Sequence, residues 1–251
     1  MEKISDVKKN ILRSEIEQIA KDFRKEYFDI CESPISNSFK AAEELGFFVV
    51  SASAPNELSG FTTTIDDKSM IVVNSKHPLG RQNYSIWHEI YHWYANDGKE
   101  VSLMGNIAYN ETEFKAEAFA AEILLEKESL EKELNKLGYK SLNKNDMKYL
   151  KKKDIVMLQN KFKVSYKAML TRIIIISNNQ DLKSRYGIAS NQEKIIQFNV
   201  KCGFNGELEK PTLKPYISES LFEYLTINLE KGRISRAYVE QFLEFLERGI
   251  K

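Results

Sequence analysis

Cysteine is scarce in this sequence, with two cysteines among 251 residues. Cys31 and Cys202 lie far apart and outside any spacing typical of a metal site, which argues against a disulfide framework and against a cysteine-bound metal cluster. Two isolated thiols are typical of proteins in a reducing compartment. We therefore expect a cytoplasmic protein.

Long hydrophobic runs and an excess of one charge are also missing. The most apolar run, residues 173–176, is far too short to span a bilayer, and residues 1–21 are charged, without an apolar signal region. The net charge is +1, with 37 basic and 36 acidic residues. The composition therefore requires neither a membrane nor a nucleic-acid partner, and we expect no direct binding of either.

Histidine is scarce as well, yet two of the three histidines form the most informative motif of the chain. Residues 88–92 read His-Glu-Ile-Tyr-His. On a helix, positions i and i+4 lie on one face about 5.4 Å apart along the axis, so His88 and His92 can bind one zinc ion. Glu89 lies beside them, where it can take a proton from a metal-bound water. This HExxH pattern of zinc metallopeptidases predicts that His88 and His92 are metal ligands and that Glu89 is the catalytic base.

A catalytic zinc site needs a third protein ligand, which spacing alone does not identify. His77 lies in a turn just before the motif helix and would have to fold back onto it. The better source is the predicted helix downstream, whose candidates are Glu111, Glu113, Glu117 and Glu122. Glu113 also fits a capping box with Asn110, and Glu117 also fits a partner for a histidine N–H. The residues favour Glu113 and Glu117 and leave the choice open.

The hydrophobic patterns predict an α+β fold with a small antiparallel sheet and a helical core that carries the motif helix. Helices are expected over 5–29, 39–45, 81–94, 111–130 with a continuation to 135, 154–162, 165–176, 218–230 and 235–248, and strands over 47–52, 61–64, 70–73 and 194–200.

Three segments are expected along the chain: an N-terminal helical segment over 1–37, a peptidase domain over 38–180, and a small α+β extension of unknown role over 191–251. The Asn-, Ser- and Gln-rich loop at 177–193 is the expected boundary. We also predict that strand 61–64 or strand 71–73 forms a sheet edge to which a substrate peptide adds as a further strand.

Five ordered motifs between residues 38 and 176 resemble the ImmA/IrrE metallopeptidases. They are Ala41–Gly46, Ile71–Asn74 followed by Arg81–Tyr84, the pentad His88–His92, Glu113–Leu125, and Phe162–Ile173. The sequence departs from the family pattern at Tyr91, where a glycine is usual, and at Glu126-Lys127, where Met-Pro is common. We expect the ring of Tyr91 to narrow the cleft.

The resemblance implies that Glu113 is the third zinc ligand and that Glu117 lies next to the ligands. It also implies a zinc-dependent endopeptidase that cleaves one partner protein, such as a helix-turn-helix transcriptional repressor, in stress responses or mobile-element induction. Tyr84 and Tyr109 are candidates to stabilise the oxyanion.

Two other functions compete with this interpretation. One is a zinc-binding regulator that binds a partner without general protease activity. The other is DNA binding by the helix pair 154–176, which the four consecutive isoleucines at 173–176 disfavour because they predict a core helix.

Overall fold

The computed structural model describes residues 4–31, 33–65, 68–95 and 111–250. Tyr109 and Asn110, named above as an oxyanion candidate and a helix cap, lie outside the described residues. No helix within the described ranges is long and apolar enough to cross a membrane.

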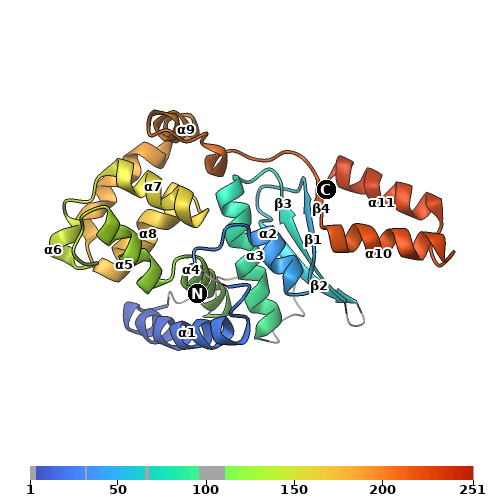
Figure 1. Ribbon diagram of the computed structural model, residues 1–251, viewed down its shortest axis with the longest axis horizontal. Helices are drawn as coiled ribbons and strands as arrows, with labels where there is room; N and C mark the ends of the chain where they lie inside the picture. The colour runs from blue at the N-terminus through green and yellow to red at the C-terminus, as the bar shows by residue number, and fades with distance from the viewer. Residues whose placement is uncertain (1–3, 32, 66–67, 96–110, 251) are drawn as a thin grey trace.

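A four-stranded sheet in the order β2-β3-β1-β4 lies in the middle of the molecule (Figure 1). The strands are β1 (Phe48–Ala52), β2 (Gly60–Ile65), β3 (Lys68–Asn74) and β4 (Tyr216–Ile217). The hairpin β2–β3 is antiparallel as predicted, and β4 is antiparallel to β1. The α+β class is confirmed, but the expectation of a purely antiparallel sheet is wrong, because β1 pairs with β3 in parallel.

Asn74 explains how the parallel pair arises. Its side-chain amide donates to the carbonyls of Ala54, Pro55 and Leu58, and its side-chain oxygen accepts from the amide of Ala54. These bonds hold the loop between β1 and β2. The chain crosses from β1 to the edge strand β2, and β3 then lies between these two strands and pairs with both. The structure therefore confirms an edge for β2, whereas β3 is internal.

The helices mostly match the predictions. They are α1 (Asp6–Glu26), α2 (Ser38–Glu44), α3 (Leu79–Tyr94), α4 (Glu111–Leu124), α5 (Lys127–Lys136), α6 (Lys144–Met147), α7 (Lys152–Phe162), α8 (Tyr166–Ser177), α9 (Gln192–Lys201), α10 (Glu219–Glu230) and α11 (Arg236–Arg248), with 3-10 segments η1 (Gln180–Ser190) and η2 (Glu207–Glu209).

Two of the predicted elements need correction. The helix expected over 111–130 and beyond is two helices, α4 and α5, separated by Leu125 and Glu126. The strand expected over 194–200 is helix α9. The side chain of Asn191 caps α9, and Ile195 and Asn199 are buried one turn apart, so the helical period prevails over the β-branched composition.

The main core lies between the sheet and helices α1, α3 and α4. Phe23 of α1 makes edge-on ring contacts with Trp87 and Phe119, at centroid distances of 6.3 and 5.3 Å. The indole N–H of Trp87 donates to the hydroxyl of Ser38 at 3.1 Å. The contacts of Trp87 fix the rotation of α3, and His88 and His92 then lie on the side of this helix that faces Glu113 of α4.

The C-terminal segment covers the other face of the sheet. Val50, Ala52 and Val72 pack there against Leu221 of α10 and Leu246 of α11. Figure 1 shows these two helices projecting as a hairpin from the side of the sheet opposite α3. Since β4 also pairs with β1, the extension contributes to the same sheet as the predicted peptidase segment.

Candidate metal centre

The start of α3 is anchored by its own Gln82 and Asn83, whose side chains hydrogen-bond to other parts of the chain. The amide of Gln82 donates to the carbonyl of His77 at 2.7 Å, and its oxygen accepts from the hydroxyl of Ser51 at 3.2 Å. Asn83 donates to the carbonyl of Lys163, in the turn between α7 and α8, at 2.8 Å. Ser51 belongs to the sheet, His77 to the loop that follows it, and Lys163 to the turn between α7 and α8. The start of α3 is therefore fixed relative to the sheet.

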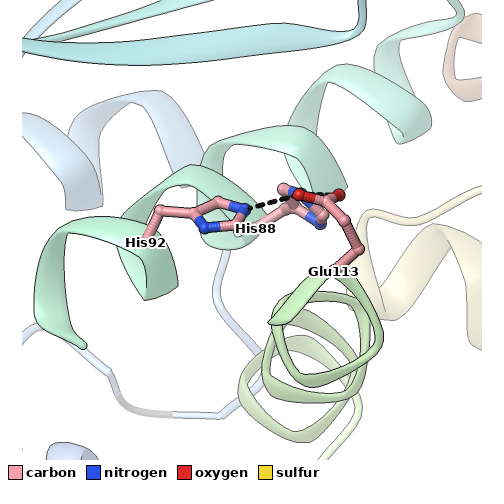
Figure 2. Close-up of side chains that lie close together, drawn as sticks. All are labelled: His88, His92 and Glu113. Atoms are coloured by element: carbon pink, nitrogen blue, oxygen red, sulfur yellow. Dashed lines mark hydrogen bonds and ion pairs between the residues drawn. The ribbon is translucent and has the colours of Figure 1, made fainter. Parts of the chain in front are cut away.

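His88 and His92 of α3 and Glu113 of α4 point toward one another (Figure 2). The Nε2 atoms of the histidines are 3.1 Å apart, and they lie 3.3 and 3.4 Å from the two carboxylate oxygens of Glu113. In a tetrahedral site with zinc bonds of about 2.0–2.1 Å, neighbouring ligand atoms are separated by roughly 3.3–3.4 Å. The three side chains are therefore close enough together to converge on one zinc ion.

The electrostatics of this cluster favour a cation at its centre. Hydrogen bonds from His88 and His92 hold the pKa of the Glu113 carboxyl well below its ordinary value, against the effect of burial. Burial lowers the pKa of His88, but its hydrogen bond to Glu113 and the charges of the nearby glutamates raise it by more, so the net shift is upward. Glu113 is therefore held as a carboxylate, the form that binds a metal cation.

Glu89 lies beside this cluster with its carboxyl buried. The hydroxyl of Thr62, on the edge strand β2, donates to Oε2 of Glu89 at 3.3 Å. Burial raises the pKa of Glu89, while the neighbouring His88 and His92 and the Thr62 hydrogen bond oppose the rise. Glu89 is therefore an oriented carboxyl next to the candidate ligands.

The comparison with protein families agrees with this geometry. The family model of peptidase M78, described as the IrrE N-terminal-like domain, matches residues 42–174, which is more than half of the chain. The chain belongs to this family. No curated protein matches the chain at the significance required. The match confirms the resemblance to ImmA/IrrE proteins found from the motifs.

Within this IrrE-like domain, the other sequence candidates for a third ligand have different partners. Glu111 forms an ion pair with Lys8 at 3.1 Å. Glu122 accepts from the Arg172 guanidinium. His77 makes a hydrogen bond through Nε2 to the carbonyl of Asn56 at 3.0 Å. Glu117 lies one turn beyond Glu113 and lines the neighbouring cavity. Among the described residues, the metal-like cluster contains Glu113 alone of these candidates.

A cavity of about 580 Å³ opens beside the cluster. His88 and Glu89 form part of its wall, Gly60 at the start of β2 borders it, and α8 closes the side away from the sheet. Ala118 and Ala121 line the α4 side, where their small side chains leave room. The candidate site of the IrrE-like domain therefore opens onto a cavity that reaches the start of β2.

The expectation that Tyr91 narrows this cleft is not supported. Tyr91 is 4% exposed, packs on Phe119 at a ring-centroid distance of 5.4 Å, and is not part of the described cavity wall. Tyr84 does line the cavity, but its hydroxyl donates to the carbonyl of Glu117 at 2.5 Å. Tyr84 therefore contributes to the contact between α3 and α4.

Sequence analysis assigned no role at this site to Thr62, Gly60 or Arg172, although Arg172 belongs to the motif Phe162–Ile173. A Cβ at Gly60 would lie 2.8 Å from the carbonyl oxygen of Val72, so β2 needs glycine there to approach β3. Arg172 forms a two-pronged pair with Glu122 and donates to the carbonyl of Leu125 at 3.0 Å. These roles depend on contacts between remote segments, for which short motifs carry no signal.

Proposed function

We propose that this protein is a zinc-dependent endopeptidase with His88, His92 and Glu113 as zinc ligands and Glu89 as the catalytic base. The observation that carries the proposal is that the Nε2 atoms of His88 and His92 lie 3.1 Å apart and 3.3–3.4 Å from the carboxylate oxygens of Glu113, next to an oriented glutamate on an open cavity. Two nitrogens and one carboxylate are a donor set that suits zinc in hydrolases. Membership of a peptidase family supports the same chemistry.

Glu89 has the central role in the proposed reaction. His88, His92 and Glu113 would hold the zinc ion, which when bound would supply polarisation of the scissile carbonyl and a lowered pKa of water. Glu89 accepts the proton of the attacking water and later transfers it to the leaving amine. The Thr62 hydroxyl holds one oxygen of the Glu89 carboxyl, which leaves the other oxygen free to handle the proton.

The substrate is proposed to bind as an extended strand along β2. This strand is an edge of the sheet, and Ser59 and Gly60 at its start line the cavity beside Glu89. An edge strand offers backbone N–H and C=O groups, so a peptide gains main-chain hydrogen bonds in any sequence. This arrangement brings a scissile bond next to the base.

The proposed substrate is a helix-turn-helix transcriptional repressor, and the site of action is the cytoplasm. This part rests on the resemblance to ImmA/IrrE proteins and on the peptidase family. Incubation of the purified protein and zinc with the repressor encoded by a neighbouring gene tests it, with a chelator as control. We expect one cut, which the chelator and the Glu89→Gln variant both prevent.

Two outcomes would count against this function. Digestion of unfolded casein at many sites would indicate a degradative enzyme. Tight, zinc-dependent binding of the repressor without any cleavage by the wild-type protein would instead support a zinc-binding regulator.

A further inference from the structure

The charge of the chain is strongly segregated, although its net charge is only +1. Residues 136–167 contain ten lysines and two acidic residues, so the remainder of the chain is net acidic. The lysines are Lys136, Lys140, Lys144, Lys148, Lys151, Lys152, Lys153, Lys161, Lys163 and Lys167, and all except Lys163 are exposed. Such a cluster of positive charges produces a local electrostatic field, which the net charge of the whole chain does not reveal.

Four of these lysines line one hollow of about 650 Å³: Lys136, Lys140, Lys151 and Lys153. We call it the lysine hollow. It lies where α5 and the following turn meet the start of α7, at the end of the molecule opposite the α10–α11 hairpin (Figure 1). It is thus separate from the candidate metal centre, and no residue lines both cavities.

The two acidic residues of the lysine hollow are engaged within the protein. Asp154 accepts from the Tyr139 hydroxyl at 2.6 Å and is buried. Asp146 accepts from the Ser141 hydroxyl at 2.9 Å. In the described part of the chain, Lys136 is the one lysine of the hollow that forms an ion pair, with Glu133. The other ammonium groups of the hollow are therefore directed to solvent.

An exposed aromatic ring adjoins these charges. Tyr149 lines the hollow and is 68% exposed, so much of its ring is accessible to a ligand. The ammonium of Lys148 lies 4.7 Å from the centre of this ring, within the range of a cation–π contact. A base that stacks on the free part of Tyr149 would place its phosphate among the lysines.

We propose that the lysine hollow binds single-stranded nucleic acid. Lys140, Lys151 and Lys153 contact the phosphates, and Tyr149 stacks on a base, the combination by which proteins bind single strands without sequence preference. A concave surface with an exposed ring favours this ligand over a flat anionic membrane or an acidic protein segment, neither of which offers a base to stack. The proposal replaces the expectation, drawn from net charge, that no nucleic acid binds.

Fluorescence anisotropy of a labelled oligothymidylate of roughly 20 nucleotides, with the full-length protein, measures the binding directly. If about four phosphates are neutralised, the logarithm of the association constant falls with the logarithm of salt concentration with a slope near −3. The triple variant Lys140→Glu, Lys151→Glu and Lys153→Glu should weaken binding at least tenfold and flatten this slope.

A matched triple variant controls for net charge. Lys76→Glu, Lys214→Glu and Lys231→Glu change the charge by the same amount at exposed lysines outside the hollow, so binding should stay within about twofold of the wild type. Equal loss of binding in both triple variants would overturn the proposal. If the first variant unfolds, the same three lysines changed to glutamine give the test, with a smaller expected loss.

The ring supplies an independent test of the class of ligand. Tyr149→Ala should weaken oligothymidylate binding by about fivefold or more, whereas Tyr149→Phe should retain it, because stacking needs the ring and not the hydroxyl. Duplex of the same length, polyglutamate and vesicles containing phosphatidylserine serve as competitors. Tighter binding of any of these than of the single strand, without an effect of Tyr149→Ala, would reject single-stranded nucleic acid as the ligand.

Discussion

His88, His92 and Glu113 lie close enough together to bind one metal ion, so the metal content of the protein tests the site directly. We predict one zinc per chain in the wild type. His88→Ala and His92→Ala each remove one of two nitrogen donors and should lose zinc on dialysis, and Glu113→Ala should weaken binding by at least tenfold. Metal analysis of the purified variants measures this.

Glu117→Ala is the matched control for Glu113. It removes a carboxylate from the same face of α4 one turn later, outside the cluster of three ligand atoms. Zinc content should therefore remain near one per chain. Loss of zinc in Glu117→Ala with retention in Glu113→Ala would reverse the assignment that the resemblance implied.

The proposed catalytic base, Glu89, gives a second prediction, which separates chemistry from metal binding. Glu89→Gln keeps the size of the side chain and its hydrogen bond with Thr62, but an amide cannot accept the proton of water. Zinc content should be unchanged, and the cleavage rate should fall by about 10²–10⁴-fold. Full activity of this variant in a cleavage assay would exclude Glu89 as the base.

The sequence was sufficient for part of this site. His88, Glu89 and His92 follow from one pentad because an α-helix fixes the geometry of residues four apart. The position of Glu113 could not be obtained in this way, since it depends on how α4 packs on α3, and only the resemblance selected it. Thr62 reaches Glu89 from a strand, and no local pattern predicts such a contact.

A buried ion pair between Arg172 of α8 and Glu122 of α4 links these two helices. The side chains of Arg172 and Glu122 are 8% and 14% exposed, and Arg172 also bonds the carbonyl of Leu125 where α4 ends. Arg172→Gln leaves a carboxylate poorly solvated, so the free energy of unfolding should fall by about 3 kcal/mol. Urea denaturation with an unchanged m-value would measure it.

Two variants control this prediction. Arg248→Gln breaks an exposed pair with Glu244, whose side chains are 74% and 58% exposed, and should change stability by less than about 0.5 kcal/mol. Adding Glu122→Gln to Arg172→Gln removes the unpaired charge and should restore part of the loss. A loss in Arg172→Gln no larger than that in Arg248→Gln would show that the pair is not structurally important.

The elements themselves were largely predictable, because helix periods and caps are local. Helices α3, α7 and α8 lie where the apolar spacing predicts them. Strand pairing was less predictable: the parallel alignment of β1 with β3 depends on the bonds of Asn74 to the loop before β2. Residues 194–200 show the limit of composition, since a β-branched segment forms helix α9 when its apolar side chains recur with the helical period.

The start of α3 makes hydrogen bonds to residues that lie outside the family match. The match ends at residue 174, yet the amide of Leu79 donates to the carbonyl of Lys210 at 2.9 Å, and Thr212 accepts from the Gln82 amide at 3.1 Å. The same segment, residues 207–218, includes β4 at the edge of the sheet. The C-terminal segment therefore supports the helix that carries His88 and His92.

Gly80 lies at the centre of this junction, and we predict that it tolerates no side chain. A Cβ there would lie 2.5 Å from the amide nitrogen of Ser165 and 3.1 Å from the carbonyl oxygen of Leu208, both backbone atoms that cannot rotate away. Gly80→Ala must push α3 away from α8 and η2 and should cost about 1–3 kcal/mol of unfolding free energy. Gly187→Ala, where nothing lies within 4 Å, should leave stability within about 0.5 kcal/mol of the wild type. Because α3 carries both histidines, Gly80→Ala should also weaken zinc binding while Gly187→Ala leaves it intact. Equal unfolding midpoints and zinc affinities for the two variants would show that the position of α3 does not depend on this close contact.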